Sequence, residues 1–228
     1  MMLSKNAKRY LSKCFRDNQL IFTQSELISE FNKIDCTLTD RLCNILLNYS
    51  GFYFKISFVD PYLFEFGVTS KYLIQNNVTI TFISIDNHNY YLIGTTFFTD
   101  ETFFINDNGE VYKIINNRPL KVFSAFEYYI ELMAFYNTLH GYTFGNQLFL
   151  TNHSIALLKI RHSFNSLPDY CGPDYSFFKS KMFSKFKLIL IVSNIGEVNK
   201  FELNYLTKND LDDSYIDNYL AEMGIPLL

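Results

Sequence analysis

The sequence lacks tryptophan and the short motifs that carry the most specific catalytic chemistry. No phosphate-binding P-loop, dinucleotide fingerprint or nucleophile elbow is present. The cysteines are few, scattered and without a Cys-x-x-Cys pair: Cys14, Cys36, Cys43 and Cys171. This spacing argues against a zinc site and a disulfide framework, so we expect a reduced cytoplasmic protein that binds no metal and no cofactor.

A basic excess and long apolar runs are missing too. Lys and Arg total 20 against 23 Asp and Glu, a formal net charge of −3, whereas a protein that binds nucleic acid directly needs a basic surface. No predominantly apolar stretch without charges reaches the roughly 20 residues that span a bilayer. The charged residues near the start of the chain argue against a signal peptide. We therefore expect no direct nucleic-acid binding and no membrane contact.

The charges that are present are unevenly distributed. The start of the chain is basic, through Lys5, Lys8, Arg9, Lys13 and Arg16. The end is acidic, through Asp210, Asp212, Asp213, Asp217 and Glu222. These runs predict either solvated helix faces or complementary ends that steer a partner.

Apolar and aromatic side chains are abundant, at 48% and 18% of the residues, and they predict a folded chain with a core. Residues 90–136 show the most consistent local pattern: short strands, Asn-Asp-Asn-Gly, another strand and an amphipathic helix. Asn-Gly is a strong hairpin signal, because it adopts positive φ at little steric cost. Residues 116–119 are predicted as a loop. Ser124 with Glu127 predicts a capping box at the start of the closing helix.

Three helices are predicted before this segment. Residues 3–17 have apolar residues at helical spacing, and Thr23 with Glu26 forms a capping-box pattern for a second helix. The third helix begins at Thr37 or Thr39 and ends at a Tyr-Ser-Gly stop. The buried face of the second helix is predicted to contain Leu27, Ile28 and Phe31.

The strand pattern predicts an antiparallel sheet between the third helix and the closing helix, from residues 52–59, 78–85, 90–93, 102–105 and 111–115. The rest of the chain predicts a strand at 142–150, a strand or helix at 155–161, a helix at 175–187, a hairpin of 188–192 with 200–205, and a final helix from Asp212 or Ser214. We therefore predict an α+β fold with N-terminal helices, a twisted antiparallel sheet and a closing amphipathic helix. Residues 1–140 form one domain, and residues 141–228 form a C-terminal α/β extension or small second subdomain.

The order of these elements, with the sequences LTDRLCNILLNYSG, YYLIG, FFINDNGEVYKI and PLKVFSAFEYYIELM, resembles the SUKH superfamily. In that family a helix ends at a short aromatic-and-glycine stop, a twisted antiparallel sheet follows, and a Gly-x-Val-Tyr strand leads to a closing helix. The resemblance spans residues 23–136, and residues 141–228 have no counterpart in a minimal SUKH domain. The matching parts are residues 42–51, 93–94, 104–112 and 122–133.

The resemblance implies a protein-binding module without enzymatic activity. Bacterial members typically act as immunity proteins that bind and neutralise a toxin domain, often a nuclease or a deaminase; related eukaryotic and viral members are interaction modules. We therefore expect a protein partner, a toxin domain with a basic surface. One alternative is a viral or cellular structural or host-interaction protein on the same fold. Another is a hydrolase that uses Cys171 with His153 or His162.

The candidate partner-binding residues lie on and beside the turns of the predicted sheet. Carboxylates there could mimic phosphates toward a basic nuclease-type toxin. These carboxylates belong to Asp100, Glu101, Asp107 and Glu110. Beside them, Tyr90 and Tyr91 offer large rigid rings that suit the energetic centre of an interface, although one of the two is equally suited to the core. No residue is assigned a catalytic role.

Overall fold

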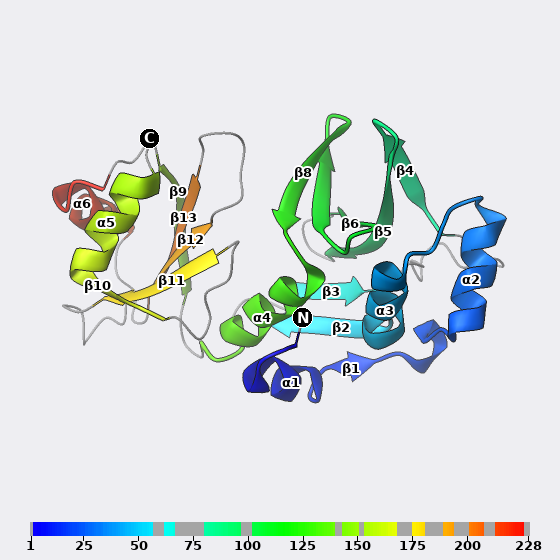
Figure 1. The fold of residues 1–228 in the computed structure, drawn as a ribbon. Helices are drawn as coiled ribbons and strands as arrows, with labels where there is room; N and C mark the ends of the chain where they lie inside the picture. Colours follow the sequence, from blue (N-terminus) through cyan, green and yellow to red (C-terminus); the bar gives the residue numbers. More distant parts are fainter. Residues whose placement is uncertain are drawn as a thin grey trace. The chain divides into compact units, whose positions relative to one another are not determined.

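Figure 1 shows the computed structural model of the protein. It describes residues 2–56, 62–66, 80–96, 102–139, 143–150, 153–167, 175–180, 189–193, 201–207 and 213–225. The chain divides into two compact units, Met1–Asn137 and Thr138–Leu228, which we call unit 1 and unit 2. Each unit combines helices with an antiparallel sheet, so the predicted α+β class is confirmed. Among the residues described, no helix has the length and apolar character that a membrane span requires.

The sheet of unit 1 is antiparallel and strongly twisted. Its described strands are β1 (Phe15–Arg16), β2 (Phe52–Ile56), β3 (Tyr62–Phe66), β4 (Phe82–Ile85), β5 (His88–Thr96), β6 (Thr102–Asn106), β7 (Val111–Ile115) and β8 (Arg118–Phe123). They pair in the order β1-β2-β3-β5-β6-β7-β8, and β4 pairs with the first half of β5. In Figure 1, β2 and β3 run across the direction of β8. β5 therefore connects strands β1–β3 to strands β6–β8, and it also pairs with β4.

The hairpin β7–β8 corrects the prediction of a loop at residues 116–119. Asn116 and Asn117 have φ of 51° and 59° and form the turn alone, because Asn tolerates the left-handed conformation that a type I′ turn requires at both positions. The chain then enters β8 directly, and Pro119 pairs with Ile114. Proline is compatible with this position because β8 is at the edge of the sheet.

The helices of unit 1 are α1 (Lys5–Leu11), α2 (Gln24–Lys33), α3 (Asp40–Tyr49) and α4 (Phe126–Tyr136), with a short 3₁₀ helix at Asn18–Leu20. The predicted capping box of α2 is confirmed: Thr23 Oγ1 accepts from Glu26 N at 3.3 Å, and Glu26 Oε2 accepts from Thr23 N at 2.7 Å. Thr39 rather than Thr37 caps α3, since its hydroxyl accepts from Leu42 N. Local sequence therefore specifies where these two helices begin.

The first helix is shorter than predicted, because the chain leaves it at Leu11 and Arg16 joins β1. The Arg16 guanidinium donates to Ser50 O at 2.9 Å and to Leu47 O at 3.0 Å. It also lies 4.8 Å from the centre of the Phe52 ring. Burial lowers the pKa of Arg16. This member of the basic N-terminal run therefore closes the C-terminal end of α3 rather than forming part of a solvated face.

α4 begins differently from the prediction. Its N-cap is Ala125, which makes no side-chain capping bond, so the expected capping box of Ser124 and Glu127 is wrong. The first backbone donor of the helix, Phe126 N, instead donates to Gly109 O at 3.0 Å. Glu127 is only 3% exposed, and its carboxylate pairs with another helix instead of capping α4. It forms a two-pronged ion pair with Arg41 of α3, with one Nη1–Oε1 distance of 2.7 Å.

The turn of residues 106–110, between β6 and β7, holds both helices. Thr39 Oγ1, which caps α3, donates to Asp107 O at 2.7 Å, and Gly109 O accepts from the start of α4. Gly109 has φ +80°, as the Asn-Gly signal predicts, and a Cβ there would lie 2.5 Å from Ile45 Cδ1. We call this arrangement, together with the Arg41–Glu127 pair, the turn clamp. It connects the sheet to two helices through backbone carbonyls.

Unit 2 has its own sheet and core. Its described strands, in spatial order, are β10 (Phe164–Ser166), β11 (Tyr175–Ser180), β12 (Ile189–Ser193), β13 (Phe201–Thr207) and β9 (Thr143–Leu150). Its described helices are α5 (His153–Ser163) and α6 (Asp213–Glu222). The core consists of Ala156, Ile160, Phe164, Leu203, Tyr205, Ile216, Leu220 and Ile225. Both helices therefore contribute to one core with β13.

The predictions for unit 2 are confirmed in part. β12 and β13 pair as the expected antiparallel hairpin, and the ambiguous segment at 155–161 belongs to the helix α5. The helix predicted at 175–187 is wrong for Tyr175–Ser180, which forms β11 between two other strands. The remainder of that segment lies outside the described residues. In this case strand pairing on both sides overrides a helix-like spacing of apolar residues.

Replacing Arg41 with Leu is expected to destabilise the turn clamp, because the buried Glu127 carboxylate loses its partner. We expect the local unfolding free energy of α3 and α4 to fall by about 2–4 kcal/mol, below the upper end of the range for buried pairs because Arg41 is partly exposed. Native-state amide hydrogen exchange measures it. The double variant R41L/E127L should recover most of the loss. K33A, which breaks the exposed Lys33–Glu30 pair, should cost less than about 1 kcal/mol; equal losses in R41L and K33A would contradict the role of the clamp.

A side chain at residue 109 would cost stability in two ways, through a clash with Ile45 and through the positive φ of the backbone. A second glycine with positive φ allows the two costs to be measured separately. G109A is expected to destabilise unit 1 by about 2–4 kcal/mol, since it adds a clash with a core side chain to the cost of positive φ. Gly224 has φ +65°, but a Cβ there meets only the flexible end of Lys159. G224A should therefore cost unit 2 only about 1–2 kcal/mol. Hydrogen exchange in each unit gives both values, and equal costs would show that the contact with Ile45 is unimportant.

Candidate functional site

Of the four acidic turn residues, the structure describes Asp107 and Glu110, and both make contacts within the fold. Asp100 and Glu101 lie outside the described residues. Glu110 accepts hydrogen bonds from Asn106 Nδ2 at 2.7 Å, Tyr112 Oη at 2.8 Å and Lys121 Nζ at 2.6 Å. Burial alone would raise the pKa of Glu110, but these partners outweigh it and hold the pKa below its usual value. Glu110 is therefore held by partners within the fold, and its assignment to a partner surface stays a prediction.

Asp107 is also part of the fold. Its carbonyl is fixed by Thr39 in the turn clamp. Its carboxyl oxygen Oδ1 is shielded from solvent and has no hydrogen-bond partner among the described residues. Burial raises the pKa of this carboxyl, and the nearby Tyr91 hydroxyl and His88 only partly oppose that effect. A half-buried carboxyl of this kind does not present a phosphate-like charge to a partner.

The two tyrosines proposed as interface anchors are core residues. Tyr90 is 7% exposed and Tyr91 is 1% exposed. The Tyr91 ring lies 5.1 Å from that of Phe31 on α2, and Tyr90 packs edge-on against Tyr112 at 5.0 Å. Neighbouring residues of a strand point to opposite faces of a sheet, and here both faces of β5 are covered. Neither ring is available to a partner, which corrects that assignment.

The buried Tyr91 hydroxyl lies among three half-buried residues, and we call the group the Tyr91 cluster: Cys36, Asn89, Tyr91 and Asp107. Asn89 Nδ2 donates to Cys36 Sγ at 3.6 Å. Tyr91 Oη lies near Cys36, Asn89 and Asp107, but neither it nor Asp107 Oδ1 meets hydrogen-bond geometry with a described group. Burial, followed by the negative charge of Asp107, raises the pKa of Tyr91. The cluster contains a donor and an acceptor whose hydrogen-bonding capacity is not used within the described residues.

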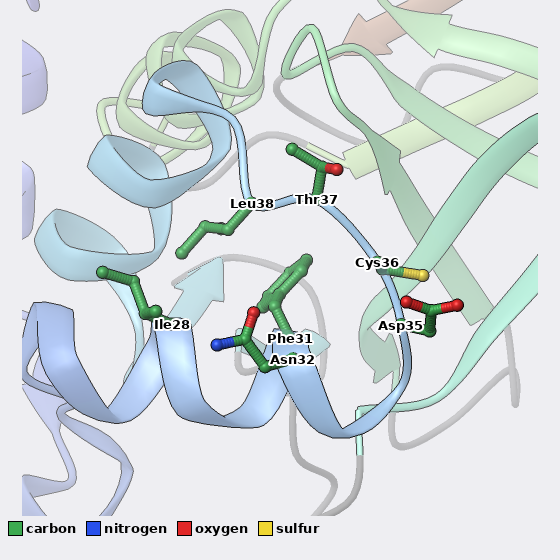
Figure 2. Close-up of a pocket in the computed structure, with 7 residues that line it drawn as sticks. All are labelled: Ile28, Phe31, Asn32, Asp35, Cys36, Thr37 and Leu38. Atoms are coloured by element: carbon green, nitrogen blue, oxygen red, sulfur yellow. The ribbon is translucent and has the colours of Figure 1, made fainter.

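Cys36 also lines a hollow between α2 and α3, which we call the α2–α3 hollow. Its volume is about 330 Å³, and it is lined by Ile28, Phe31, Asn32, Asp35, Cys36, Thr37 and Leu38 (Figure 2). This volume lies at the lower end of the about 300–1,000 Å³ typical of ligand pockets. It suits one side chain or small group rather than a whole helix.

The end of α2 sets the shape of the hollow. Cys36 N donates back to Phe31 O at 3.1 Å, and Asp35 N donates to Asn32 O at 3.2 Å. Asp35 takes the left-handed conformation, φ 54°, at the position after the helix where glycine is most common. The chain therefore turns sharply out of α2, and Thr37 and Leu38 follow as the opposite wall before α3 begins.

The residues that line the hollow differ in chemistry and direction. Figure 2 shows the side chains of Ile28, Phe31 and Leu38 inside the bend formed by α2 and the connection to α3, whereas those of Asp35 and Cys36 lie on the other side of that connection. Phe31 is buried, whereas Ile28 is 45% exposed although the sequence predicts it on the buried face of α2. The hollow therefore has an apolar wall, and the exposed Asp35 lies beside it.

Sequence reasoning missed this site. The available signal was Ile28, which lies one position beyond Leu27 and off the narrow stripe that Leu27 and Phe31 form at a spacing of one helical turn. An apolar residue at that position is a candidate for surface contact. The sequence alone does not say that the α2–α3 connection leaves a hollow beside it.

The hydrolase alternative is not addressed by the described residues. Cys171 and the side chain of His153 lie outside them, and His162 is exposed on α5. Within the described parts of both units, no group of three or more His, Cys, Asp and Glu side chains is arranged to hold a metal ion.

Comparison with known proteins identifies no relative. No protein-family model matches the chain, and no curated protein and no solved structure matches it. The SUKH resemblance therefore rests on the sequence pattern alone.

The two turn carboxylates are expected to affect stability with opposite sign. The lowered pKa of Glu110 means that folding favours its charged form, so its contribution is present above the usual Glu pKa and is lost as pH falls through the lowered value. E110Q should therefore destabilise unit 1 at pH 7. The raised pKa of Asp107 means the reverse: its penalty is absent below the usual Asp pKa and grows as pH rises through the raised value.

D107N should consequently stabilise unit 1 at neutral pH, and the gain should vanish in acid. Hydrogen exchange and urea unfolding between about pH 3 and pH 8 cover both titrations. A loss of stability in both variants at neutral pH would contradict the unfavourable burial of Asp107.

Proposed function

We propose that unit 1 is a non-enzymatic protein-binding module of the SUKH type, acting as an immunity protein that binds and neutralises a toxin domain with a basic surface. The observation that supports this function is the α2–α3 hollow, a depression with an apolar wall and an exposed carboxylate beside it. The binding surface is accordingly centred on the hollow rather than on the turn of residues 106–110.

The charges around the hollow favour a basic partner. Asp35 lines it, and Asp40 is exposed at the start of α3, two residues after Leu38. Asp86 is exposed on the β4–β5 turn, three residues before Asn89, which bonds Cys36 of the hollow. Carboxylates grouped in this way raise the rate of association with a basic protein and orient it.

The nearby cations do not cancel this charge. Lys33 is paired with Glu30 at 2.5 Å. Arg41 is held by Glu127, and this hydrogen-bonded partner raises the pKa of its guanidinium. Within the part of the chain that the structure describes, these pairs leave the carboxylates around the hollow uncancelled.

The walls of the hollow are also held in place before any partner binds. Thr39, directly after the lining residues Thr37 and Leu38, is anchored to Asp107 O. Cys36 is held by Asn89 on β5. A preorganised surface loses less conformational entropy on binding, so a larger share of the contact energy appears as affinity.

The test is binding of the full chain to toxin domains encoded beside its gene, by copurification and calorimetry. The variant I28D/D35K should weaken binding at least about tenfold, a change of about 1.4 kcal/mol. E222K reverses an exposed carboxylate on α6 of unit 2 and should leave the affinity unchanged. Failure to bind any neighbouring toxin domain would reject the immunity function.

A structural or host-interaction role on the same fold is the second candidate. The observation in its favour is unit 2, whose sheet and core exceed a minimal SUKH domain. The gene neighbourhood separates the two, because an immunity gene lies beside a toxin gene and the alternative does not require one.

A further inference from the structure

We propose that β4 is a dimerisation edge, which pairs antiparallel with β4 of a second copy of the chain about a two-fold axis through Ile83. This inference does not depend on the proposed function, because no residue of β4 lines the α2–α3 hollow. It rests on the direction of the backbone groups of β4, on the composition of the strand and on the register of a symmetric pair.

The turn between β4 and β5 sets the hydrogen-bond pattern of the strand. Residues 86 and 87 have φ of 50° and 62° and form a two-residue hairpin turn. The pair that flanks such a turn, Ile85 with His88, is hydrogen-bonded. Hydrogen-bonded and non-hydrogen-bonded pairs alternate along an antiparallel ladder, so Ile83 with Tyr90 is the next bonded pair.

The residues between these pairs direct their backbone groups outward. Leu92 N donates to Thr81 O at 2.9 Å, as the alternation requires. The N–H and C=O groups of Phe82 and Ser84 therefore point away from β5. Among the described strands β5 is the one that pairs with β4 (Figure 1), and Thr81, Ile83 and Ser84 are exposed. The outer side of β4 is thus an open edge within the described part of unit 1.

The composition of β4 does not protect this edge. Edge strands commonly carry a lysine, a proline, an inward-pointing charge or a bulge, each of which discourages pairing with another chain. β4 reads Phe-Ile-Ser-Ile, and its register with β5 is regular throughout. Ile83 is 37% exposed. An uncharged, regular edge with an exposed apolar residue is a template for a further strand.

A second copy matches the template in register. A two-fold axis through Ile83 places Phe82 opposite Ser84 of the second copy, and Ser84 opposite Phe82 of that copy. These are the residues with outward-pointing groups, so each of the two pairs exchanges two N–H···O bonds. A register shifted by one residue would place outward groups opposite inward ones and lose both pairs.

The side chains are compatible with the same register. The two Ile83 residues form the non-hydrogen-bonded pair at the centre, where facing side chains come closest. α2 does not lie between them: the Phe82 ring is 6.2 Å from Tyr91, which packs against Phe31 of α2 at 5.1 Å, and Ile83 points to the other face of the sheet. The two Asp86 residues lie at opposite ends of the paired strands, so their charges are kept apart.

The geometry also sets the size and strength of the assembly. An isologous contact uses the same edge of both copies and closes at two. Two four-residue strands bury less than the about 1,000 Å² of a stable interface, so the dimer is weak and reversible. We expect a dissociation constant between about 50 µM and about 1 mM.

The experiment is sedimentation equilibrium of the full chain between about 10 µM and about 1 mM, which brackets this range. The average mass should rise reversibly from the 26.8 kDa of one chain and approach twice that value. Growth beyond two copies would contradict the two-fold pairing.

The key variant is S84P, since proline is tolerated in an edge strand where its nitrogen faces outward. It removes one outward donor and places a ring on the edge, so the dissociation constant should rise at least about tenfold. S84A is the matched control. Both variants lose the bond from Ser84 Oγ to Asn89 Oδ1, but S84A keeps the backbone N–H and should change the dissociation constant less than about twofold. Slow exchange of the Leu92 amide shows that the β4–β5 hairpin of each variant is folded.

Amide hydrogen exchange supplies a second readout, which identifies the surface that pairs. Exchange at Phe82 and Ser84 should slow as the concentration rises, whereas Ile83, bonded to β5, should be protected at every concentration. This alternation distinguishes pairing through β4 from a dimer formed elsewhere on the molecule.

Three outcomes would overturn the inference. The first is a single-chain mass at about 1 mM, above the expected dissociation constant. The second is a dimer that S84P leaves unchanged, which would place the contact on another surface. The third is protection of Phe82 and Ser84 that appears only when a neighbouring toxin domain is added, which would make β4 a site for a partner strand. A dimer with the alternating protection supports the inference whether or not a toxin domain binds.

Discussion

The fold of unit 1 depends on the hydrogen bonds that the turn of residues 106–110 makes with the starts of two helices. The first N–H groups of a helix have no partner within it, and α4 has no side-chain cap. Gly109 O accepts the hydrogen bond of Phe126 N, the first residue of α4. The Thr39 hydroxyl, which caps α3, donates to Asp107 O. A hairpin turn thus becomes the joint between the helices and the sheet. The joint can close only because residue 109 has no side chain.

The same joint also holds the α2–α3 connection in place. A connection between two helices usually lies on the surface and is mobile. Here its last residue, Thr39, is bonded to the sheet, and its first residues are closed onto α2 by backbone hydrogen bonds. The lining residues between these two anchors therefore have little freedom. The surface is shaped by the core beneath it, although its own residues are mostly exposed.

The features that the sequence could predict are those that depend on neighbours in the chain. Thr23 with Glu26 satisfies backbone donors within one helical turn, and Asn-Gly sets the φ of Gly109 locally. Burial is different, because it depends on residues far away. Glu127 has the sequence of a capping residue but pairs with Arg41, 86 residues earlier.

The candidate site was harder to predict for the same reason. The tyrosines of β5 are covered by other elements, and the turn of residues 106–110 is fixed by a hydroxyl 68 residues away. A turn rich in polar residues normally lies in water, and nothing within it signals that two helices begin against it. The hollow likewise arises where a helix end, a connection and a strand meet, so no single segment encodes it.

Pro119 in the edge strand β8 has a consequence for how unit 1 can be recognised. In a hairpin with a two-residue turn, the flanking pair Ile115 and Arg118 is hydrogen-bonded, and the next pair, Ile114 with Pro119, is not. The amide position of Pro119 therefore faces away from β7, where proline offers no donor. At the other end of the sheet, β1 has only two residues. Neither end offers a continuous backbone template, so a partner that docks at those ends has to recognise side chains and cannot lengthen the sheet by adding a strand.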